Sequence, residues 1–325
     1  MPKKLVIVES PAKARTIGKY LGSDFVVESS VGHIRDIPAK ANQVADSKRD
    51  AWKATRFGID IDNEFTAMYI VTPDSKQQVT KLRKELKGAD ALYLATDEDR
   101  EGEAIAWHLL EVLKPKVPVH RMVFHEITEE AINEAVANPR DLDLELVEAQ
   151  ETRRILDRLF GFEVSPVLWK KVQRGLSAGR VQSPATRIIV DRERERIAFV
   201  AASYGGITGT FSTGDDGLPN FAAALVGVDG ERVATGKDFD EDGQPRKDRL
   251  VLTAEDTAAL ATELTKVDFS VSGVERKPYT RKPYAPFRTS TLQQEAGRKL
   301  RFGAKRTMSV AQRLYESGHI TYMRT

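Results

Sequence analysis

Acidic side chains gather in one stretch of the sequence, directly after an apolar run. The run ALYLAT ends at Thr96, and Asp97, Asp99 and Glu101 follow it at every second position. If the run is a strand, this spacing brings the three carboxylates toward one point at its carboxyl end. Glu9 ends a second apolar run, LVIVE. Parallel strands place their carboxyl ends at one edge of a sheet, so we expect the four acids to meet there.

Carboxylates this close together repel one another, so at least one keeps its proton unless a cation neutralises the group. Their oxygens suit Mg²⁺, which takes few protein ligands and keeps water molecules for exchange with phosphate. The sequence therefore predicts a Mg²⁺ site, with Asp97 and Asp99 as the main ligands, Glu9 adjoining them and Glu101 further out. The plainer interpretation is an acidic helix N-terminus, which the helix dipole favours.

The elements that would position these acids alternate between strand and helix. The predicted strands are 3–8, 25–30, 67–71, 91–96 and 119–124. The predicted helices are 11–21, 74–87, 102–113 and 128–137, and the first of them opens with the N-cap and proline signals of Ser10-Pro11. This alternation predicts an α/β domain with a mostly parallel, Rossmann-like sheet over residues 1–138, with an irregular insert at about 36–64.

The pattern changes twice beyond this domain. Residues 139–202 are helical throughout, and residues 203–277 have short alternating runs with Gly and Asp-Gly turns, typical of an antiparallel sheet. Residues 278–325 contain two helical stretches and a final run, SGHITYMRT. We therefore expect a helical domain, a partial antiparallel β domain and the start of a second helical domain. Read as a strand, the final run places Ile320, Tyr322 and Arg324 on one face.

Composition excludes several classes of protein. The chain has 325 residues, of which 41% are hydrophobic and 30% charged, as in a folded globular protein. It has no cysteine, which excludes disulfides and zinc–thiolate sites. Its apolar runs are too short to span a membrane, and the N-terminal run LVIV is too short for a signal peptide. We expect a cytoplasmic protein.

Charge is distributed unevenly along the chain. Residues 276–325 hold twelve Lys and Arg against two acids, and residues 151–190 hold eight against three. Residues 207–268 are acidic, with thirteen Asp and Glu against six Lys and Arg. Basic charge concentrated in this way is typical of a surface that binds a polyanion. The alternative is a set of solvated helix faces.

Longer motifs point to a family. The stretches LVIVESPAKARTI and ATDEDREGEAIAWHL resemble the Toprim domain of bacterial type IA DNA topoisomerases. Toprim domains also occur in primases, recombination-mediator proteins and nucleases, so the acids alone leave the activity open. The stretches ETRRILDRL, VSPVLWKKVQRGLSAGRVQSPATR and QRLYESGHITYMRT resemble bacterial topoisomerase I in that family's order. Glu98 stands where many members have proline, which adds a charge and removes no metal ligand.

The resemblance implies a type IA topoisomerase architecture, of which this chain would be a truncated N-terminal part. It implies ATP-independent relaxation of negatively supercoiled DNA through single-strand cleavage, strand passage and Mg²⁺-dependent resealing. The implied partners are single-stranded and negatively supercoiled DNA, with no membrane, and the implied state is a monomer associated with the nucleoid. Because family members continue after this point, we expect the fragment to relax plasmid poorly or not at all, with helices 289–317 loosely held.

The resemblance also assigns catalytic residues. Tyr322 matches the nucleophile that forms a 5′-phosphotyrosine, which keeps the energy of the broken backbone and makes ATP unnecessary. Arg324 would hold the scissile phosphate, and we expect cationic neighbours to favour the phenolate of Tyr322. Glu9 would act as the general acid for the departing 3′ oxygen. Lys13, one helical turn after the first strand, would stabilise the same phosphate.

A further set of residues matches DNA-contacting positions of the family. Two arginines of TRRILD suit phosphates, the aspartate would orient an arginine or accept from a base, and two aromatic side chains could stack on bases, although a core position is the alternative for the tryptophan. SAGRVQ would open a helix whose free N–H groups bind phosphate. The set is His33, Arg153, Arg154, Asp157, Phe162, Trp169, Ser177, Ala178, Gly179, Arg180, Val181, Gln182 and Arg324. Arg121, Gln312 and Glu316 are predicted to support the active site.

Three alternatives stay open at this point. A topoisomerase III-like decatenase belongs to the same family. A Toprim nuclease or primase would not need Tyr322. A non-catalytic DNA-binding module would bind DNA independently of Asp97 and Asp99.

Overall fold

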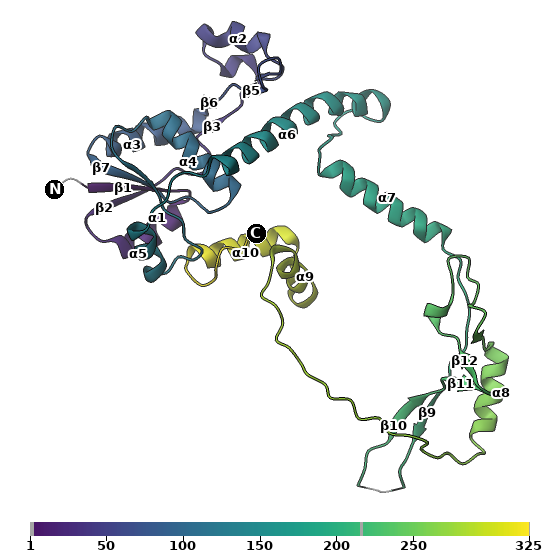
Figure 1. Ribbon diagram of the computed structural model, residues 1–325. Helices are drawn as coiled ribbons and strands as arrows, with labels where there is room; N and C mark the ends of the chain where they lie inside the picture. The colour runs from purple at the N-terminus through teal and green to yellow at the C-terminus, as the bar shows by residue number, and fades with distance from the viewer. Residues whose placement is uncertain (1–2, 215–216, 325) are drawn as a thin grey trace. The chain divides into compact units, whose positions relative to one another are not determined.

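The computed structural model describes residues 3–214 and 217–324. The chain divides into two compact units (Figure 1). Unit 1 comprises Met1–Arg180 and Pro283–Thr325, and unit 2 comprises Val181–Lys282. The four domains predicted from the sequence are a finer division, and their boundaries stay a prediction.

A four-stranded parallel sheet forms the centre of unit 1, in the order β2-β1-β7-β8. Its strands are β1 (Lys3–Val8), β2 (Phe25–Ser29), β7 (Ala89–Leu94) and β8 (Val119–Arg121). Val6 pairs in register with Val27 on one side and with Tyr93 on the other. Because all four strands run the same way, their carboxyl ends share one edge, and the predicted acids follow the strands at that edge.

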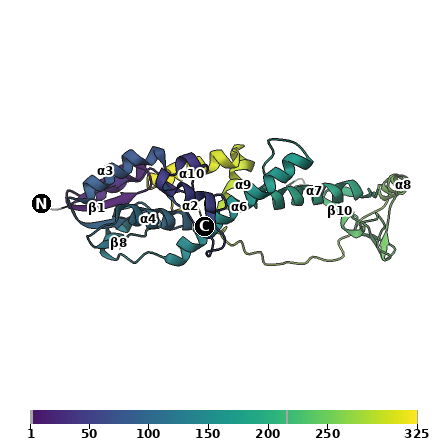
Figure 2. The same cartoon turned by 90° about the horizontal axis from the view of Figure 1, so that it is seen from above.

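Helices cover both faces of this sheet (Figure 1), and Figure 2 gives the view from above. The helices of unit 1 are α1 (Pro11–Leu21), α2 (Arg49–Ala54), α3 (Lys76–Leu86), α4 (Arg100–Leu113), α5 (Glu129–Ala137), α6 (Leu144–Lys171), α9 (Thr289–Leu300) and α10 (Ala304–Glu316). Side chains of α1, α5 and α10 pack with Val6 and Tyr93, whereas those of α3 and α4 pack with Leu5 and Leu92. Alternate strand residues thus face opposite layers. The predicted α/β fold is confirmed.

The predicted insert is a small lobe of short elements. β3 (Arg35–Asp36) pairs with β6 (Ile70–Val71), and β4 (Ile59–Asp60) pairs with β5 (Thr66–Ala67). Three single turns of 3₁₀ helix lie at Ala41–Gln43, Asp46–Lys48 and Pro73–Ser75. The prediction of one continuous strand over 67–71 is wrong. Ala67 pairs with β4 inside the lobe, whereas Ile70 and Val71 pair with β3 at the base of the lobe.

The final segment, residues 317–324, is not the strand that alternation predicts. Among the described residues, one main-chain hydrogen bond joins it to a distant part of the chain, from Tyr322 N to His125 O at 2.7 Å. A strand needs a ladder of such bonds. The adjacent Tyr322 and Met323 are both buried, each 7% exposed, so side chains of this segment do not alternate between a core face and a solvent face.

The helix before this segment packs against the sheet domain. Ala311 and Tyr315 of α10 join the apolar cluster that contains Ile17 and Ile127, and Tyr315 is fully buried. We expected the helices over 289–317 to be loosely held, because much of their packing partner would be missing. For α10 the sheet domain supplies one.

Unit 2 combines two helices with small sheets. Its helices are α7 (Gln182–Ala198) and α8 (Ala254–Leu264). Its strands are β9 (Thr208–Phe211), β10 (Phe221–Ala224), β11 (Gly227–Val228), β12 (Glu231–Val233) and β13 (Arg249–Leu250), with a 3₁₀ turn at Gly236–Asp238. β9 and β10 are antiparallel, as are β11 and β12, whereas β12 and β13 are parallel. None of the helices in the described ranges of either unit is both long and apolar enough to cross a membrane.

Candidate active site

The ends of two neighbouring strands bring acidic side chains together. Glu9 follows β1, and Asp97 follows β7 after two residues. The Asp97 N–H donates to Glu9 Oε1 at 2.8 Å. Asp99 is the N-cap of α4 and accepts from Gly102 N at 2.8 Å. A Cβ at Gly102 would lie 2.1 Å from the Asp97 carbonyl oxygen, so only glycine allows the helix to start this close to the acids.

Arg121 stabilises the loop that carries the acids through hydrogen bonds to its backbone. Its side chain is 1% exposed, and Nη2 donates to the Asp97 carbonyl oxygen at 2.7 Å. Nη1 donates to Leu94 O at 3.1 Å, and Nε donates to the buried Glu103 carboxylate at 3.0 Å. Arg121 therefore acts on the backbone around Asp97, in keeping with the support role predicted for it and not with a direct DNA contact.

Lys13 places a cation between the two strand ends. The side chain is fully buried on α1, which the Ser10 hydroxyl caps by accepting from Lys13 N at 3.3 Å. Its ammonium pairs with Asp97 Oδ1 and lies 3.6 Å from Glu9 Oε2. Burial raises the pKa of Glu9 to about 7, with Lys13 opposing the shift and Asp97 adding to it. At neutral pH Glu9 can therefore both give and take a proton, as a general acid requires.

Tyr322 lies at the same edge. Its phenol donates to Asp99 Oδ2 at 2.5 Å, and its ring centroid is 5.1 Å from that of Tyr315. Burial raises the pKa of Tyr322, and Asp97 and Asp99 raise it further, while Arg324 lowers it. Arg324 thus favours the phenolate, as expected of a cationic neighbour, but burial and the two carboxylates outweigh it and favour the neutral phenol.

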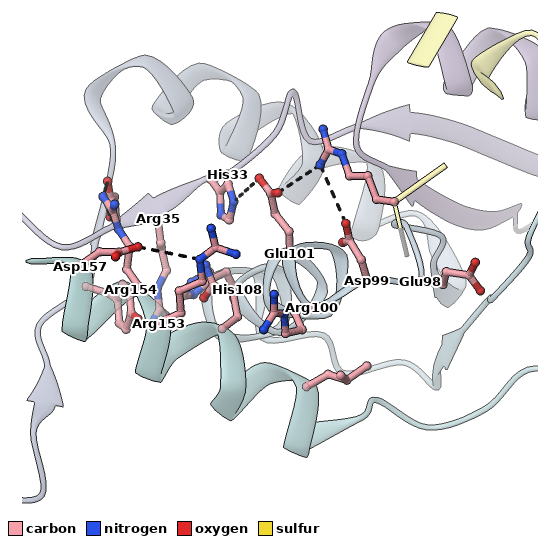
Figure 3. Close-up of a pocket in the computed structure, with 15 residues that line it drawn as sticks. His33, Arg35, Glu98, Asp99, Arg100, Glu101, His108, Arg153, Arg154 and Asp157 are labelled. Carbon is pink, nitrogen blue, oxygen red and sulfur yellow. Dashed lines mark hydrogen bonds and ion pairs between the residues drawn. The ribbon is translucent and has the colours of Figure 1, made fainter. Parts of the chain in front are cut away.

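Glu101 bridges two basic side chains, and its contact with His33 is drawn in Figure 3. Its Oε1 is 3.3 Å from His33 Nε2, and its Oε2 is 3.3 Å from Arg324 Nη1. The hydrogen bond from His33 is the main cause that lowers the pKa of Glu101. Arg324 also approaches Asp99 Oδ2, at 3.9 Å. Although the final segment is not a strand, Tyr322 and Arg324 thus reach the same carboxylate.

The acids suit Mg²⁺ chemically, but their arrangement differs from the predicted one. Within the described ranges, no three His, Asp or Glu side chains are grouped as ligands of one ion. Asp97 pairs with Lys13, Asp99 accepts from Tyr322, and Glu101 pairs with Arg324. Mg²⁺ needs only one or two carboxylates besides water and phosphate, so Asp97 and Asp99, with Glu9 adjoining, would be enough without a third grouped acid.

Most of the predicted DNA-contacting charges line one open cleft of about 1050 Å³ in unit 1 (Figure 3). Arg154 of α6 donates to both carboxylate oxygens of Asp36, at 2.7 and 2.5 Å. Asp157 pairs with Arg180 at 2.5 Å and with Arg153 at 3.9 Å. Asp157 therefore orients two arginines, which is one of the two roles predicted for it.

The two predicted stacking residues are both accessible. Phe162 is 40% exposed, with its ring 4.9 Å from that of Phe57 and the Arg158 guanidinium 4.8 Å above it. Trp169 is 48% exposed, which excludes the core position considered for it, and its Nε1 donates to Leu176 O at 2.6 Å.

We predicted that SAGRVQ would open a helix, but the helix begins only at the last residue of this stretch. Residues 177–181 are irregular, and α7 begins at Gln182 with Val181 as its N-cap residue. Ser177, Gly179 and Arg180 thus precede the helix. Ala178 is buried, and its N–H donates to Ser165 Oγ at 3.1 Å.

Of the two predicted support residues of α10, Glu316 fastens this helix to α1 and its N-cap, and Gln312 bonds to Glu316 within the helix. Glu316 Oε1 accepts from the Ser10 hydroxyl at 2.8 Å and from Gln312 Nε2 at 3.2 Å. The Thr16 hydroxyl donates to the Glu316 carbonyl oxygen at 3.0 Å. Glu316 therefore helps to keep α10, and the Tyr322 segment that follows it, beside α1.

Sequence reasoning missed Tyr315 and His125. The Tyr315 hydroxyl is 3.2 Å from Asp97 Oδ1, and its ring lies 5.2 Å from the Lys13 ammonium. His125 accepts the Tyr322 N–H through its backbone and pairs through Nδ1 with Glu98. Tyr315 lies seven positions before Tyr322, and this proximity was only a weak indication of a role for Tyr315. The contacts of His125 depend on tertiary packing, so the sequence contains no indication of them.

Comparison with known proteins identifies the family. The Toprim domain family matches residues 4–127, and the DNA topoisomerase family matches residues 141–325. The chain belongs to the bacterial type IA DNA topoisomerases. DNA topoisomerase 1 of Mycolicibacterium smegmatis is 63% identical over 330 residues, covering 99% of this chain and 35% of that protein. DNA topoisomerase 1 of Streptomyces coelicolor is 61% identical, covering 99% and 34%.

A solved structure agrees with this assignment. Full-length topoisomerase I from Thermotoga maritima matches with a TM-score of 0.73 at 39% identity, covering 99% of this topoisomerase chain and 49% of that chain. The chain spans about a third of the length of the curated relatives that it matches.

Proposed function

We propose that this topoisomerase chain binds single-stranded DNA in the cleft of unit 1 and cleaves it through Tyr322. In the whole protein this reaction would relax negatively supercoiled DNA without ATP. The observation that carries the proposal is the contact of the Tyr322 phenol with Asp99, beside the Glu9–Lys13–Asp97 cluster. A nucleophile, a proton donor and cations for a phosphate thus share one edge of the sheet.

The chemical step follows from these positions. The Tyr322 oxygen attacks the phosphorus, and the bond from phosphorus to the 3′ oxygen breaks. The phenol proton passes to Asp99, which already accepts its hydrogen bond, and Glu9 gives a proton to the departing 3′ oxygen. Lys13 and Arg324 stabilise the charge on the phosphate oxygens. Resealing runs the same transfers backwards, so Glu9 must take its proton back from the 3′ hydroxyl.

Mg²⁺, when bound, would supply positive charge that offsets the acids and the DNA phosphate during resealing. Asp97 and Asp99 would hold it, with Glu9 adjoining. Glu101 would instead align His33 and Arg324, because it contacts both. We also propose that the protein acts as a monomer on nucleoid DNA in the cytoplasm, and that this chain alone relaxes plasmid poorly.

The test is incubation of the chain with short labelled single-stranded oligonucleotides. We expect a covalent protein–DNA adduct that Tyr322→Phe abolishes. Tyr284→Phe is the matched control, because Tyr284 is fully exposed and distant in sequence from Glu9, Asp97 and Asp99, and it should keep the adduct. Strand cleavage that persists in Tyr322→Phe would instead indicate a Toprim nuclease. Binding without an adduct, unchanged in Asp97→Asn and Asp99→Asn, would indicate a binding module.

A further inference from the structure

The edge of the parallel sheet that lies opposite the acids carries lysines. Each of three neighbouring strands, β1, β7 and β8, has a pair of lysines at its amino end or shortly before it. All six side chains are exposed, and two of them, from β1 and α3, line the same shallow pocket. We call this group the lysine edge, and its members are Lys3, Lys4, Lys84, Lys87, Lys114 and Lys116.

The charge of the lysine edge is not neutralised. None of its ammonium groups forms an ion pair or a side-chain hydrogen bond with another residue in the described ranges. The segments at this edge, 3–4, 22–25, 84–90 and 114–118, hold three acids, Asp24, Glu85 and Asp90, against the six lysines. The acids of the active site lie at the other end of the strands, about 20 Å away. This distance exceeds the screening length of about 8 Å at physiological salt, so those acids do not cancel the positive charge.

Helix dipoles explain only half of this arrangement. Three of the lysines lie at the carboxyl ends of α3 and α4, where the dipole favours positive charge. The other three, Lys3, Lys4 and Lys116, belong to β1 and to the connection before β8, where no helix ends. The positive charge at this edge therefore exceeds what the helices favour, as expected for a surface that binds a polyanion.

The residue types at the lysine edge favour double-stranded DNA as this polyanion. Surfaces that bind single strands stack unpaired bases on exposed aromatic side chains. The aromatic side chains near this edge, Phe25 and Tyr93, are not exposed, and the Lys4 ammonium lies 5.2 and 6.0 Å from their ring centroids. The bases of a duplex are already stacked, so cations that contact its phosphates are sufficient to bind it.

A membrane surface fits the lysine edge less well than a duplex. Segments that bind membranes insert apolar side chains beside their cations. All exposed large apolar side chains of the described residues lie outside the segments of this edge. Neighbouring strands are about 4.8 Å apart, so the lysine pairs spread over about 10 Å, which is close to the width of about 12 Å of a major groove. Long lysine side chains can therefore contact phosphates of both strands of a duplex.

We propose that the lysine edge is a binding surface for double-stranded DNA, separate from the cleft, that contacts phosphates without reading the base sequence. The inference goes beyond the proposed function, because neither the cleft nor Tyr322 takes part in it. Lysine acts on phosphate as a point charge, and phosphate contacts carry no sequence information. With two such surfaces, one chain can hold a duplex at the lysine edge while its cleft holds an unpaired strand.

The test measures binding of the full chain to a short labelled DNA duplex by fluorescence anisotropy. Non-nucleotide linkers close both ends of the duplex, and an excess of unlabelled single-stranded oligonucleotide fills the cleft. We expect the duplex to bind in the presence of this excess. The logarithm of the affinity should fall against the logarithm of the salt concentration with a slope of about −5, because each of the six phosphate contacts contributes about −0.9.

A triple variant removes half of the charge of the lysine edge. It combines Lys84→Gln, Lys87→Gln and Lys116→Gln, which are exposed positions, so the fold should be kept. We expect the salt slope to become shallower by about three and the affinity for the duplex to fall at least about tenfold at low salt.

A matched control makes the same change of net charge elsewhere. It combines Lys237→Gln, Lys247→Gln and Lys266→Gln, three exposed lysines of the acidic part of unit 2. Binding of the duplex to this variant should equal that of the wild type. Melting temperatures of both triple variants establish that they are folded.

Several results would overturn the inference. Excess single strand that displaces the duplex would place the duplex in the cleft. Equal duplex affinity in the wild type and the lysine-edge variant, or an equal loss in the unit 2 control, would mean that these lysines are not the contact. Binding of phosphatidylglycerol vesicles, but not of the duplex, would identify a membrane surface instead.

The Tyr322 adduct with short single-stranded oligonucleotides, measured on the same proteins, keeps the two proposals apart. The lysine-edge variant should form the adduct as the wild type does. Normal adduct formation without duplex binding overturns the lysine edge alone, whereas duplex binding without any adduct overturns the proposed cleavage alone.

Discussion

The two units of the chain differ in how far their strand and helix side chains are buried. In unit 1 the last four residues of β1 and of β7 are all buried. In unit 2, β10 is exposed along its whole length, and none of the described side chains of α7 is buried. Ile189 and Ile197 of α7 are 69% and 73% exposed.

This difference shows where the geometry of the active site comes from. The acids, Lys13 and Tyr322 all belong to unit 1, whose two-sided core fixes the strand ends that position them. The positions of these side chains therefore depend on packing within unit 1, whereas unit 2 exposes apolar surface of the kind that folded proteins usually cover. The same substitution should consequently have different effects in the two units.

The largest difference is expected for arginines in ion pairs. Arg121→Met should lower the free energy of unfolding of unit 1 by about 3 kcal/mol, because it leaves the buried Glu103 with only Arg140 as an ion-pair partner. Urea unfolding followed by tryptophan fluorescence measures this effect, since Trp52, Trp107 and Trp169 all lie in unit 1.

The control for this prediction is Arg196→Met on α7. Arg196 pairs with Glu193 on an exposed helix face, so its loss should not change the unfolding curve measured by circular dichroism. Equal losses in the two variants would contradict the contrast between the units.

The next effect concerns pH and Glu9. Its pKa of about 7 in the folded protein exceeds the usual value near 4.3, so the folded state prefers the protonated form. The stability that this proton contributes is complete at low pH and is lost as pH rises through 7. Without metal, the wild-type chain should therefore lose about 2–3 kcal/mol relative to Glu9→Gln between about pH 5 and pH 8.

Urea titrations of both proteins in a chelator, repeated across this pH range, measure the difference. Parallel pH profiles for the wild type and Glu9→Gln would show that Glu9 has an ordinary pKa. Its role as a proton donor at neutral pH would then lose its physical basis.

The smallest expected effect compares the same substitution at a buried isoleucine of unit 1 and at an exposed isoleucine of unit 2. Ile17→Val removes one methylene from a fully buried site in unit 1 and should reduce stability by about 1 kcal/mol. Ile189→Val removes the same group from an exposed site and should leave the melting temperature unchanged. A loss of similar size at Ile189 would mean that α7 is covered in solution.

The parts of the fold that sequence predicted are those set by local signals. The alternation of strand and helix over residues 1–138 gave the parallel sheet and its functional edge, and Ser10-Pro11 gave the start of α1. These signals work because side-chain period, N-caps and proline geometry depend on a few adjacent residues.

The parts that sequence could not predict depend on contacts between distant segments. The stretch SGHITYMRT has the alternating pattern of a strand. In the structure it makes one main-chain hydrogen bond to a distant residue, His125, and not the ladder of hydrogen bonds that a strand would make. The burial of Arg121 could not be foreseen, because it depends on Glu103 and on carbonyl groups that the fold brings to it. Glu101 shares the spacing of Asp97 and Asp99, but it pairs with the basic side chains of His33 and Arg324, and the spacing does not reveal these contacts.

The single main-chain bond between Tyr322 and His125 has a consequence for how the final segment could separate from the sheet domain. A paired strand resists removal cooperatively, since each ladder bond supports the next. A segment with one main-chain bond to the sheet domain can instead leave together with α10, once the side-chain hydrogen bonds of Tyr315, Tyr322 and Glu316 to that domain have opened. Opening would then expose the buried apolar side chains of α10 and the final segment to water. Reclosure would not require a strand to regain its register.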